Sequence, residues 1–198
     1  MPRDGHDTKR RILRSATHIA SSDGLDAISF GRVADDIGVS KGAVANHFPT
    51  AEQLQLRTID EAGAIVHAAI ADRARGAEPG LPRLRVILDA WLDYLADPPF
   101  DGGCFFGTTT VEYGARPGRL RDVLADAARA GLELILEQTR LAQRLGEISD
   151  QTPAEQVVFE LHAYLQEANW AKRILGEDAA IEYARTAIDH RLTPKGQP

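Results

Sequence analysis

The sequence predicts an all-α protein in two parts: a small three-helix domain over residues 1–50, joined by a long helix to a larger helical bundle within residues 51–198. Apolar residues recur at the spacing of amphipathic helices along most of the chain. No segment keeps the alternating apolar and polar pattern of a half-buried strand. Serine and glycine stand where short helices would begin and end between residues 24 and 40, which places the shortest helices in the N-terminal part.

The first predicted helix follows a polar N-terminus and ends at Gly24. Asp7 or Thr8 can cap its start, because a short polar side chain accepts a hydrogen bond from the first free backbone N–H groups. Its apolar residues form one stripe: Ile12, Leu13, Ala16, Ile19 and Ala20.

Two short helices follow. Ser29 can cap the second helix, Gly38 can end it in a left-handed turn, and Ser40 can cap the third. The expected buried positions are Phe30, Val33, Ala34, Ile37, Val44 and Phe48. Pro49 and Thr50 then break the chain.

The C-terminal part consists of longer helical segments. They are expected at residues 51–74, 82–96, 103–113, 118–145, 153–175 and 178–191, with a linker-like stretch at 75–80. The last two segments carry apolar residues that could pair with a second copy of the chain as a four-helix bundle. These residues are Val158, Leu161, Leu165, Ile181, Tyr183 and Ile188.

The composition excludes several classes of protein. The single cysteine, Cys104, cannot form an internal disulfide and has no neighbours at the spacing of a zinc site. The N-terminus lacks the apolar stretch of a signal peptide, and no later segment has the length and apolar content of a membrane span. We therefore expect a soluble cytoplasmic protein with no membrane partner, metal or cofactor.

The charge is unevenly distributed. The formal net charge of −6 argues against a nucleic-acid partner for the chain as a whole. Residues 1–60, however, hold eight basic and eight acidic residues, and the first 14 hold five basic and two acidic ones. The sequence thus predicts a local basic patch on a neutral domain that is attached to an acidic one.

The spacing between Phe30 and Phe48 is typical of a helix-turn-helix motif. Ala34 is small where the two helices would cross, and Gly38 follows four residues later. A helical hairpin with generic packing could produce the same pattern.

The sequence around this motif narrows the choice. The Asp23–Phe30 turn, the Val33–Gly42 core and the closing Asn46–Pro49 segment closely resemble the N-terminal domain of TetR-family transcription regulators, over residues 8–60 without a gap. The resemblance implies a repressor that a small-molecule effector releases from an inverted-repeat operator in double-stranded DNA.

The same resemblance implies that residues 41–47 form the recognition helix. Gly42, Ala43, Ala45 and Asn46 would then face the bases, with Lys41 and His47 at phosphates. Family members usually carry an aromatic residue, most often tyrosine, at the place of Ala45, and often lysine at the place of Ala51. This sequence departs from the family at both places, so its recognition face is poor in hydrogen-bond donors. Asn46 either pairs with an adenine edge or is a solvated surface amide.

Further phosphate contacts are expected from residues outside that helix. Arg32 precedes the core of the second helix, and Thr8, Lys9 and Arg10 lie at the start of the first. Arg11 and Arg14 are interpreted as part of a solvated helix face.

A second resemblance, to a C-terminal domain type in one branch of the same family, rests on Gly102–Phe106, Glu112–Tyr113, Arg116–Gly118 and Arg121–Asp122. Gly102 and Gly103 are small residues at the start of a predicted helix, where another backbone segment can approach closely. Aromatic and hydroxyl side chains nearby suit an apolar pocket with a few polar anchors: Trp91, Tyr94, Phe106, Thr109, Thr110, Tyr113, Tyr164 and Trp170. Aromatic residues at this spacing are also typical of an ordinary core, and Cys104 is either a sensor thiol or a small buried residue.

Two other functions compete with a homodimeric regulator. An all-helical enzyme would need a site around Cys104 and Glu112 or around His162, yet the chain has no nucleophile elbow, phosphate-binding glycine loop or zinc-protease motif. A helical scaffold without DNA binding would explain the donor-poor recognition helix. We expect no catalytic residues.

Overall fold

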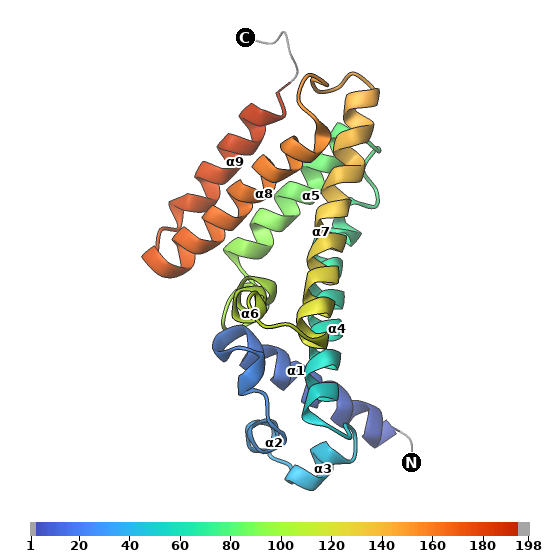
Figure 1. The fold of residues 1–198 in the computed structure, drawn as a ribbon, viewed down its shortest axis with the longest axis vertical. Coiled ribbons are helices and arrows are strands. Elements are labelled where there is room, and N and C mark those ends of the chain that lie inside the picture. The colour runs from blue at the N-terminus through green and yellow to red at the C-terminus, as the bar shows by residue number, and fades with distance from the viewer. Residues whose placement is uncertain (1–2, 194–198) are drawn as a thin grey trace. The chain divides into compact units, whose positions relative to one another are not determined.

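The computed structural model describes residues 3–193, with side chains from residue 6 onward, and every regular element in that range is helical (Figure 1). The predicted all-α fold class is therefore confirmed. The elements are α1 (Arg3–Asp23), η1 (Leu25–Ala27), α2 (Phe30–Ile37), α3 (Lys41–Ala45), α4 (Ala51–Ile70), η2 (Asp72–Ala74), α5 (Leu81–Ala96), α6 (Phe105–Tyr113), α7 (Arg119–Arg144), α8 (Ala154–Trp170), η3 (Ala171–Leu175) and α9 (Ala179–Arg191). No described helix combines the length and the hydrophobicity needed to cross a membrane.

The chain forms two compact units, and neither is a single continuous stretch. The first comprises residues 1–65 and 99–127, and the second comprises residues 66–98 and 128–198. The sequence predicts that the DNA-binding domain ends after residue 50. This functional division stays a prediction. In the structure, the compact unit that contains the first three helices also contains α6.

The limits of α2 and α3 follow the predicted local signals. The Ser29 hydroxyl accepts a hydrogen bond from the Arg32 N–H at 3.1 Å, and the Ser40 hydroxyl accepts one from the Ala43 N–H, also at 3.1 Å. Gly38 ends α2 in the left-handed conformation, with φ at 69°. Both predicted N-caps and the predicted stop are confirmed, because each depends only on neighbours within four residues.

Some predicted boundaries were wrong. Helix α1 begins at Arg3 rather than at Asp7 or Thr8, and the Asp7 carboxylate pairs with the Arg10 guanidinium one turn later, at 2.6 Å, as a residue inside a helix does. The segment expected to be helical to residue 74 leaves the α-helix after Ile70, and the one expected to residue 175 becomes π-helical after Trp170.

The core of the first unit comes from the apolar faces of α1 to α4. Most of the expected positions are buried: Ile12, Leu13, Ala16, Ile19, Ala20, Val33, Ala34, Val44 and Phe48. Phe30 and Ile37 were also expected to be buried, but both are only half-buried. Ile37 lies on the last turn of α2, where it lines an open groove instead of the core.

Segment 102–108 lies against the end of α1 within the same unit. The Gly102 N–H donates to the Ser21 hydroxyl at 3.1 Å, and the Thr108 hydroxyl donates to the Ser21 carbonyl at 3.0 Å. A Cβ at Gly102 would lie 2.1 Å from the Ser21 carbonyl carbon, so only glycine fits. The close backbone approach expected from the glycine pair is confirmed at this residue.

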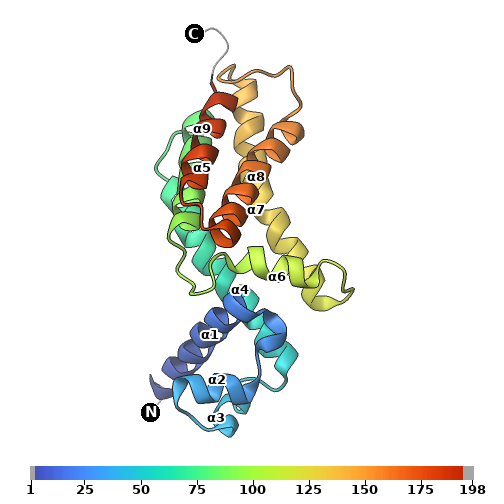
Figure 2. The same cartoon turned by 90° about the vertical axis from the view of Figure 1, so that its left-hand side faces the viewer.

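The second unit is built on α5, α8 and α9, and α8 lies side by side with α9 (Figures 1 and 2). The core of this unit contains buried leucines of α5 and α8: Leu84, Leu88, Leu92, Leu161 and Leu165. Arg185 on α9 forms ion pairs with Asp89 and Asp93 on α5, the second at 3.2 Å. These contacts fix which face of α9 is turned toward α5.

The residues expected to pair two copies of the chain were mostly wrong. Val158, Leu161, Leu165, Ile181 and Ile188 are all buried inside the second unit, where they pack within the chain. Only Tyr183 of the six is exposed, at 69%. The large apolar side chains that α8, η3 and α9 expose are instead Phe159, Trp170, Ile174, Leu175 and Tyr183.

Candidate nucleic-acid interface

Helices α2 and α3 form a short helical pair that turns one face of α3 to solvent (Figure 2). Val44 and Phe48 are buried and anchor α3 to the core. The predicted recognition positions lie on the other faces: Lys41, Gly42, Ala45 and Asn46 are exposed, and Ala43 and His47 are half-buried. Helix α3 ends at Ala45, and the Asn46 N–H still donates to the Gly42 carbonyl at 3.0 Å. Asn46 therefore continues the helical turn, with its side chain exposed.

The start of α1 is linked to the end of the helical pair. The Lys9 ammonium lies 5.9 Å from the centroid of the Phe48 ring, within the range of a cation–π contact. Arg10 is exposed but pairs with Asp7, and Thr8 is half-buried. The first turns of α1 thus bring two of the predicted phosphate-binding cations to the surface, one of them beside the residue that follows α3.

Arg32 is paired with an acidic side chain of its own domain. Its guanidinium forms an ion pair with the Asp23 carboxylate at the end of α1, and the two side chains are 45% and 47% exposed. Arg32 can therefore contact a phosphate only by leaving Asp23 or by sharing it. No local pattern in the sequence indicates this pair, because the two residues lie on different helices, nine positions apart.

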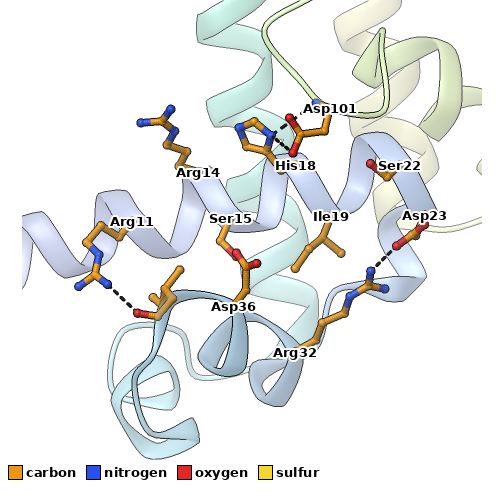
Figure 3. A pocket seen from close by; sticks show the side chains of 11 residues that line it. Arg11, Arg14, Ser15, His18, Ile19, Ser22, Asp23, Arg32, Asp36 and Asp101 are labelled. Carbon is orange, nitrogen blue, oxygen red and sulfur yellow. Dashed lines mark hydrogen bonds and ion pairs between the residues drawn. The ribbon is translucent and has the colours of Figure 1, made fainter.

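A polar groove of about 590 Å³ runs between α1 and α2 (Figure 3). It is lined by Arg11, Arg14, Ser15, His18, Ile19, Ser22, Asp23, Arg32, Asp36, Ile37 and Asp101. Several of these side chains are paired across it. The Arg11 guanidinium donates to the Ile37 carbonyl at 2.6 Å, the Ser15 hydroxyl donates to Asp36 at 2.6 Å, and His18 Nδ1 lies 3.0 Å from the Asp101 carboxylate.

These pairs refine one interpretation of the sequence. Arg11 is exposed, as expected, but it also caps the C-terminal end of α2 through the Ile37 carbonyl. The groove is lined by both acidic and basic side chains, so it is not a site for an ion of one sign, and the Arg11–Ile37 and Ser15–Asp36 hydrogen bonds link α1 to α2.

The residues predicted to bind an effector are divided between the two units. Phe106, Thr109, Thr110 and Tyr113 belong to the first unit, and Trp91, Tyr94, Tyr164 and Trp170 belong to the second. None of the eight lines the groove between α1 and α2. The assignment of these residues to a ligand site stays a prediction.

Hydrogen bonds already occupy part of the first group. The Thr109 hydroxyl donates to the Phe105 carbonyl at 3.0 Å, and the Thr110 hydroxyl donates to the Phe106 carbonyl, both within α6. The Tyr113 hydroxyl donates to Asp26 at 2.5 Å. Burial and this bond to Asp26 raise the pKa of Tyr113 above its usual value.

In the second unit, Trp91 and His162 form an edge-to-face pair with ring centroids 6.5 Å apart. Burial lowers the pKa of His162, which favours the neutral imidazole. A Cβ at Gly131 would lie 3.2 Å from the Trp91 ring, so the glycine gives the indole room on α7. Trp91 thus packs between α7 and a neutral histidine of α8.

Comparison with known proteins identifies the chain through its C-terminal part. The family model described as the tetracyclin repressor-like C-terminal domain matches residues 80–188, which is more than half of the chain. The chain belongs to the TetR family. The expectation drawn from the N-terminal residues is therefore confirmed by a different part of the sequence.

Solved TetR-family structures share the fold over nearly the whole chain. A TetR transcriptional regulator from Chloroflexus aurantiacus is 24% identical and covers 95% of both chains, with a TM-score of 0.86. A regulator from Agrobacterium tumefaciens is 17% identical and covers 96% of this chain and 99% of its own, with a TM-score of 0.83. AibR, solved with isovaleryl coenzyme A and operator DNA, is 16% identical and covers 93% and 98%, with a TM-score of 0.73.

One curated protein of another class also matches. The anthranilate phosphoribosyltransferase of Lactiplantibacillus plantarum is 31% identical over 120 residues, which is 57% of this chain and 35% of the enzyme. The chain thus spans about a third of the length of that enzyme.

Proposed function

We propose that this TetR-family transcriptional regulator binds an inverted-repeat operator as a homodimer and that a small-molecule effector releases it. The observation that carries the proposal is the α2–α3 pair, in which both N-caps are formed and one face of α3 is free of the core. A helix held at both ends by its own domain can enter a major groove without losing the packing behind it.

The exposed face of α3 favours readout by a few specific contacts. Asn46 can pair with the N6 and N7 edge of an adenine, and the Ala45 methyl can touch a thymine methyl. Lys41 and His47 flank these positions and can bind phosphates, together with Thr8, Lys9 and Arg10 on α1. Most of these groups would contact DNA phosphates, so operator affinity should depend strongly on salt. The slope of log K against log salt concentration should be about −0.9 for each phosphate neutralised.

The exposed apolar face of the second unit supports a homodimer. Phe159 is 70% exposed on α8, and Tyr183 is 69% exposed on the adjacent α9. Large aromatic side chains exposed on two neighbouring helices are typical of an interface rather than of a solvated surface. Pairing two copies by a two-fold axis would present two α3 helices, so the operator would be an inverted repeat.

The proposal of an effector rests on the family and on the predicted aromatic residues. AibR, which has the same fold, was crystallised in complex with isovaleryl coenzyme A and operator DNA. In this chain, an effector that contacts Trp91 would meet an apolar ring and a neutral imidazole, which favours a largely apolar molecule. Its coupling to DNA must be reciprocal, so operator DNA would weaken effector binding by the same factor.

An enzymatic function has less support. The match to a phosphoribosyltransferase covers only 35% of that enzyme, whereas the TetR structures are covered almost completely. We therefore propose a regulator without a catalytic site.

Selection of bound duplexes from a randomised pool tests the proposal without knowledge of the natural operator. Purified protein should enrich an inverted repeat whose half-site centres lie about 10 base pairs, or a multiple of that, apart. A variant with Lys41→Ala and Asn46→Ala is the control, and it should enrich the repeat less strongly and show no preference at one base pair of each half-site. Recovery of unrelated sequences by the parent protein would argue for a helical scaffold instead of a DNA-binding regulator.

A further inference from the structure

The turn between α1 and α2 is held by a side chain that is 87 residues away in sequence. The carboxylate of Glu112, near the end of α6, accepts hydrogen bonds from the Leu25 N–H at 2.7 Å and from the Asp26 N–H at 3.1 Å. These are the first two backbone donors of η1, which have no partner within so short a helix. Glu112 therefore acts as the N-terminal cap of η1, although it belongs to another helix.

Gly24 makes this approach possible. It has a φ of 87°, and a Cβ built on it would lie 2.6 Å from an oxygen of Glu112. The Glu112 side chain is only 16% exposed, so the bonds to the turn form in a largely water-excluded place. A hydrogen bond between a charged acceptor and backbone donors is strong under such conditions.

A second set of contacts closes the same junction. Asp26 accepts a hydrogen bond from the Tyr113 hydroxyl at 2.5 Å and forms an ion pair with Arg116. The Arg116 guanidinium also lies 5.3 Å from the centroid of the Tyr113 ring. The hydrogen bonds from Tyr113 and Arg116 hold the pKa of Asp26 below its usual value, so Asp26 stays ionised and keeps both partners.

We propose that Glu112 is a positioning residue for DNA binding. Its carboxylate fixes residues 24–26, and three residues later Ser29 begins α2, which carries α3. A turn without its cap would let α2 shift relative to α1, and contacts to base edges tolerate displacements of only about 0.5 Å. Glu112 would thus determine operator affinity from outside the surface that touches DNA. This inference rests on the proposed function.

The test compares Glu112→Gln with the parent and with Glu137→Gln, which neutralises an exposed carboxylate of α7. Glutamine keeps the size of the side chain but presents an NH₂ group to one backbone donor, so one of the two bonds is lost. We expect affinity for the selected inverted repeat to fall about ten-fold, while affinity for a scrambled duplex stays within about two-fold, because phosphate contacts do not need accurate α2 placement. Glu137→Gln should change neither affinity.

Hydrogen exchange of the free protein separates positioning from loss of fold. Glu112→Gln should speed exchange at residues 25 and 26 and leave the amides of α4 protected. The inference fails if Glu112→Gln binds the operator like the parent. It also fails if the affinities for the operator and for the scrambled duplex both fall and amide protection is lost throughout the chain. Should Glu112→Gln not fold, Arg116→Gln carries the test, with a smaller loss of operator affinity expected and parental affinity overturning the inference. If the parent itself binds no specific duplex, the proposed function fails first.

Discussion

The ion pair between Arg32 and Asp23 leads to a prediction that runs against the usual effect of a point mutation. Arg32 is expected at a phosphate, yet its guanidinium is bound to the Asp23 carboxylate in the free protein. DNA must therefore compete with Asp23 for this cation. Replacing Asp23 by asparagine keeps the shape of the side chain and removes the competing charge, so operator binding should become tighter.

The size of the effect follows from the exposure of the pair. Both side chains are close to half-exposed, at 45% and 47%, so the pair belongs to the class of surface salt bridges. Such pairs are worth about 0.2–1 kcal/mol, which corresponds to a gain in affinity of about 1.4- to 5-fold. Freed Arg32 should also add up to one phosphate contact, making the slope of log K against log salt steeper by at most about 0.9.

Fluorescence anisotropy with a labelled operator can measure changes of this size. The essential control is the same substitution in an Arg32→Gln background, where Asp23→Asn should tighten binding no more than Asp35→Asn does, because the cation for which Asp23 and DNA compete is gone. A second control is Asp35→Asn, which removes an exposed carboxylate of α2 and measures the general effect of weaker repulsion between the protein and DNA. The reasoning is refuted if Asp23→Asn weakens binding, or if it tightens binding equally in both backgrounds.

Three further predictions concern the recognition helix, the dimer and acid stability. Lys41→Ala should weaken specific and non-specific binding alike and make the dependence of affinity on salt shallower. Asn46→Ala should instead relax the preference at one base pair per half-site, at a cost of about 1–3 kcal/mol. Titrations with operators that carry single base changes distinguish the two results. Phe159→Glu places a charge on the exposed face of α8 and should shift the protein to monomer in sedimentation at micromolar concentration, while Glu155→Gln on the same helix should not. Because the folded-state pKa of Asp26 is lowered from 3.8, its stabilising contribution is complete above that pH and is lost as the pH falls through the folded value. Acid unfolding followed by circular dichroism should accordingly be less steep below pH 3.8 for Asp26→Asn, and an unchanged profile would contradict this.

The parts of the fold that the sequence predicted depend on short-range chemistry. Ser29, Gly38 and Ser40 act on backbone groups within four residues, so their positions were sufficient to place α2 and α3. The capping of η1 by Glu112 spans up to 87 positions and joins a carboxylate of α6 to the N–H groups of Leu25 and Asp26. Nothing local distinguishes such a carboxylate from a solvated one.

The face proposed to pair two copies of the chain shows a different limit. Helix α8 carries apolar residues on more than one face, with Leu161 and Leu165 fully buried and Phe159 and Trp170 exposed. Helical periodicity finds both sets but does not say which one packs inside the chain. That choice depends on α5 and α9, the helices that pack against α8.

The central claim, that α3 of this regulator reads an inverted repeat, is tested most directly by comparing two duplexes in one titration series. One carries the selected inverted repeat, and the other has a half-site scrambled; both are titrated with the parent protein at several salt concentrations. The account predicts two protomers on the intact repeat, an affinity at least about 10³-fold above that for unrelated DNA, loss of most of this preference on the scrambled duplex, and a steep fall with salt. Equal affinity for the two duplexes, or no binding above that for unrelated DNA, would contradict it.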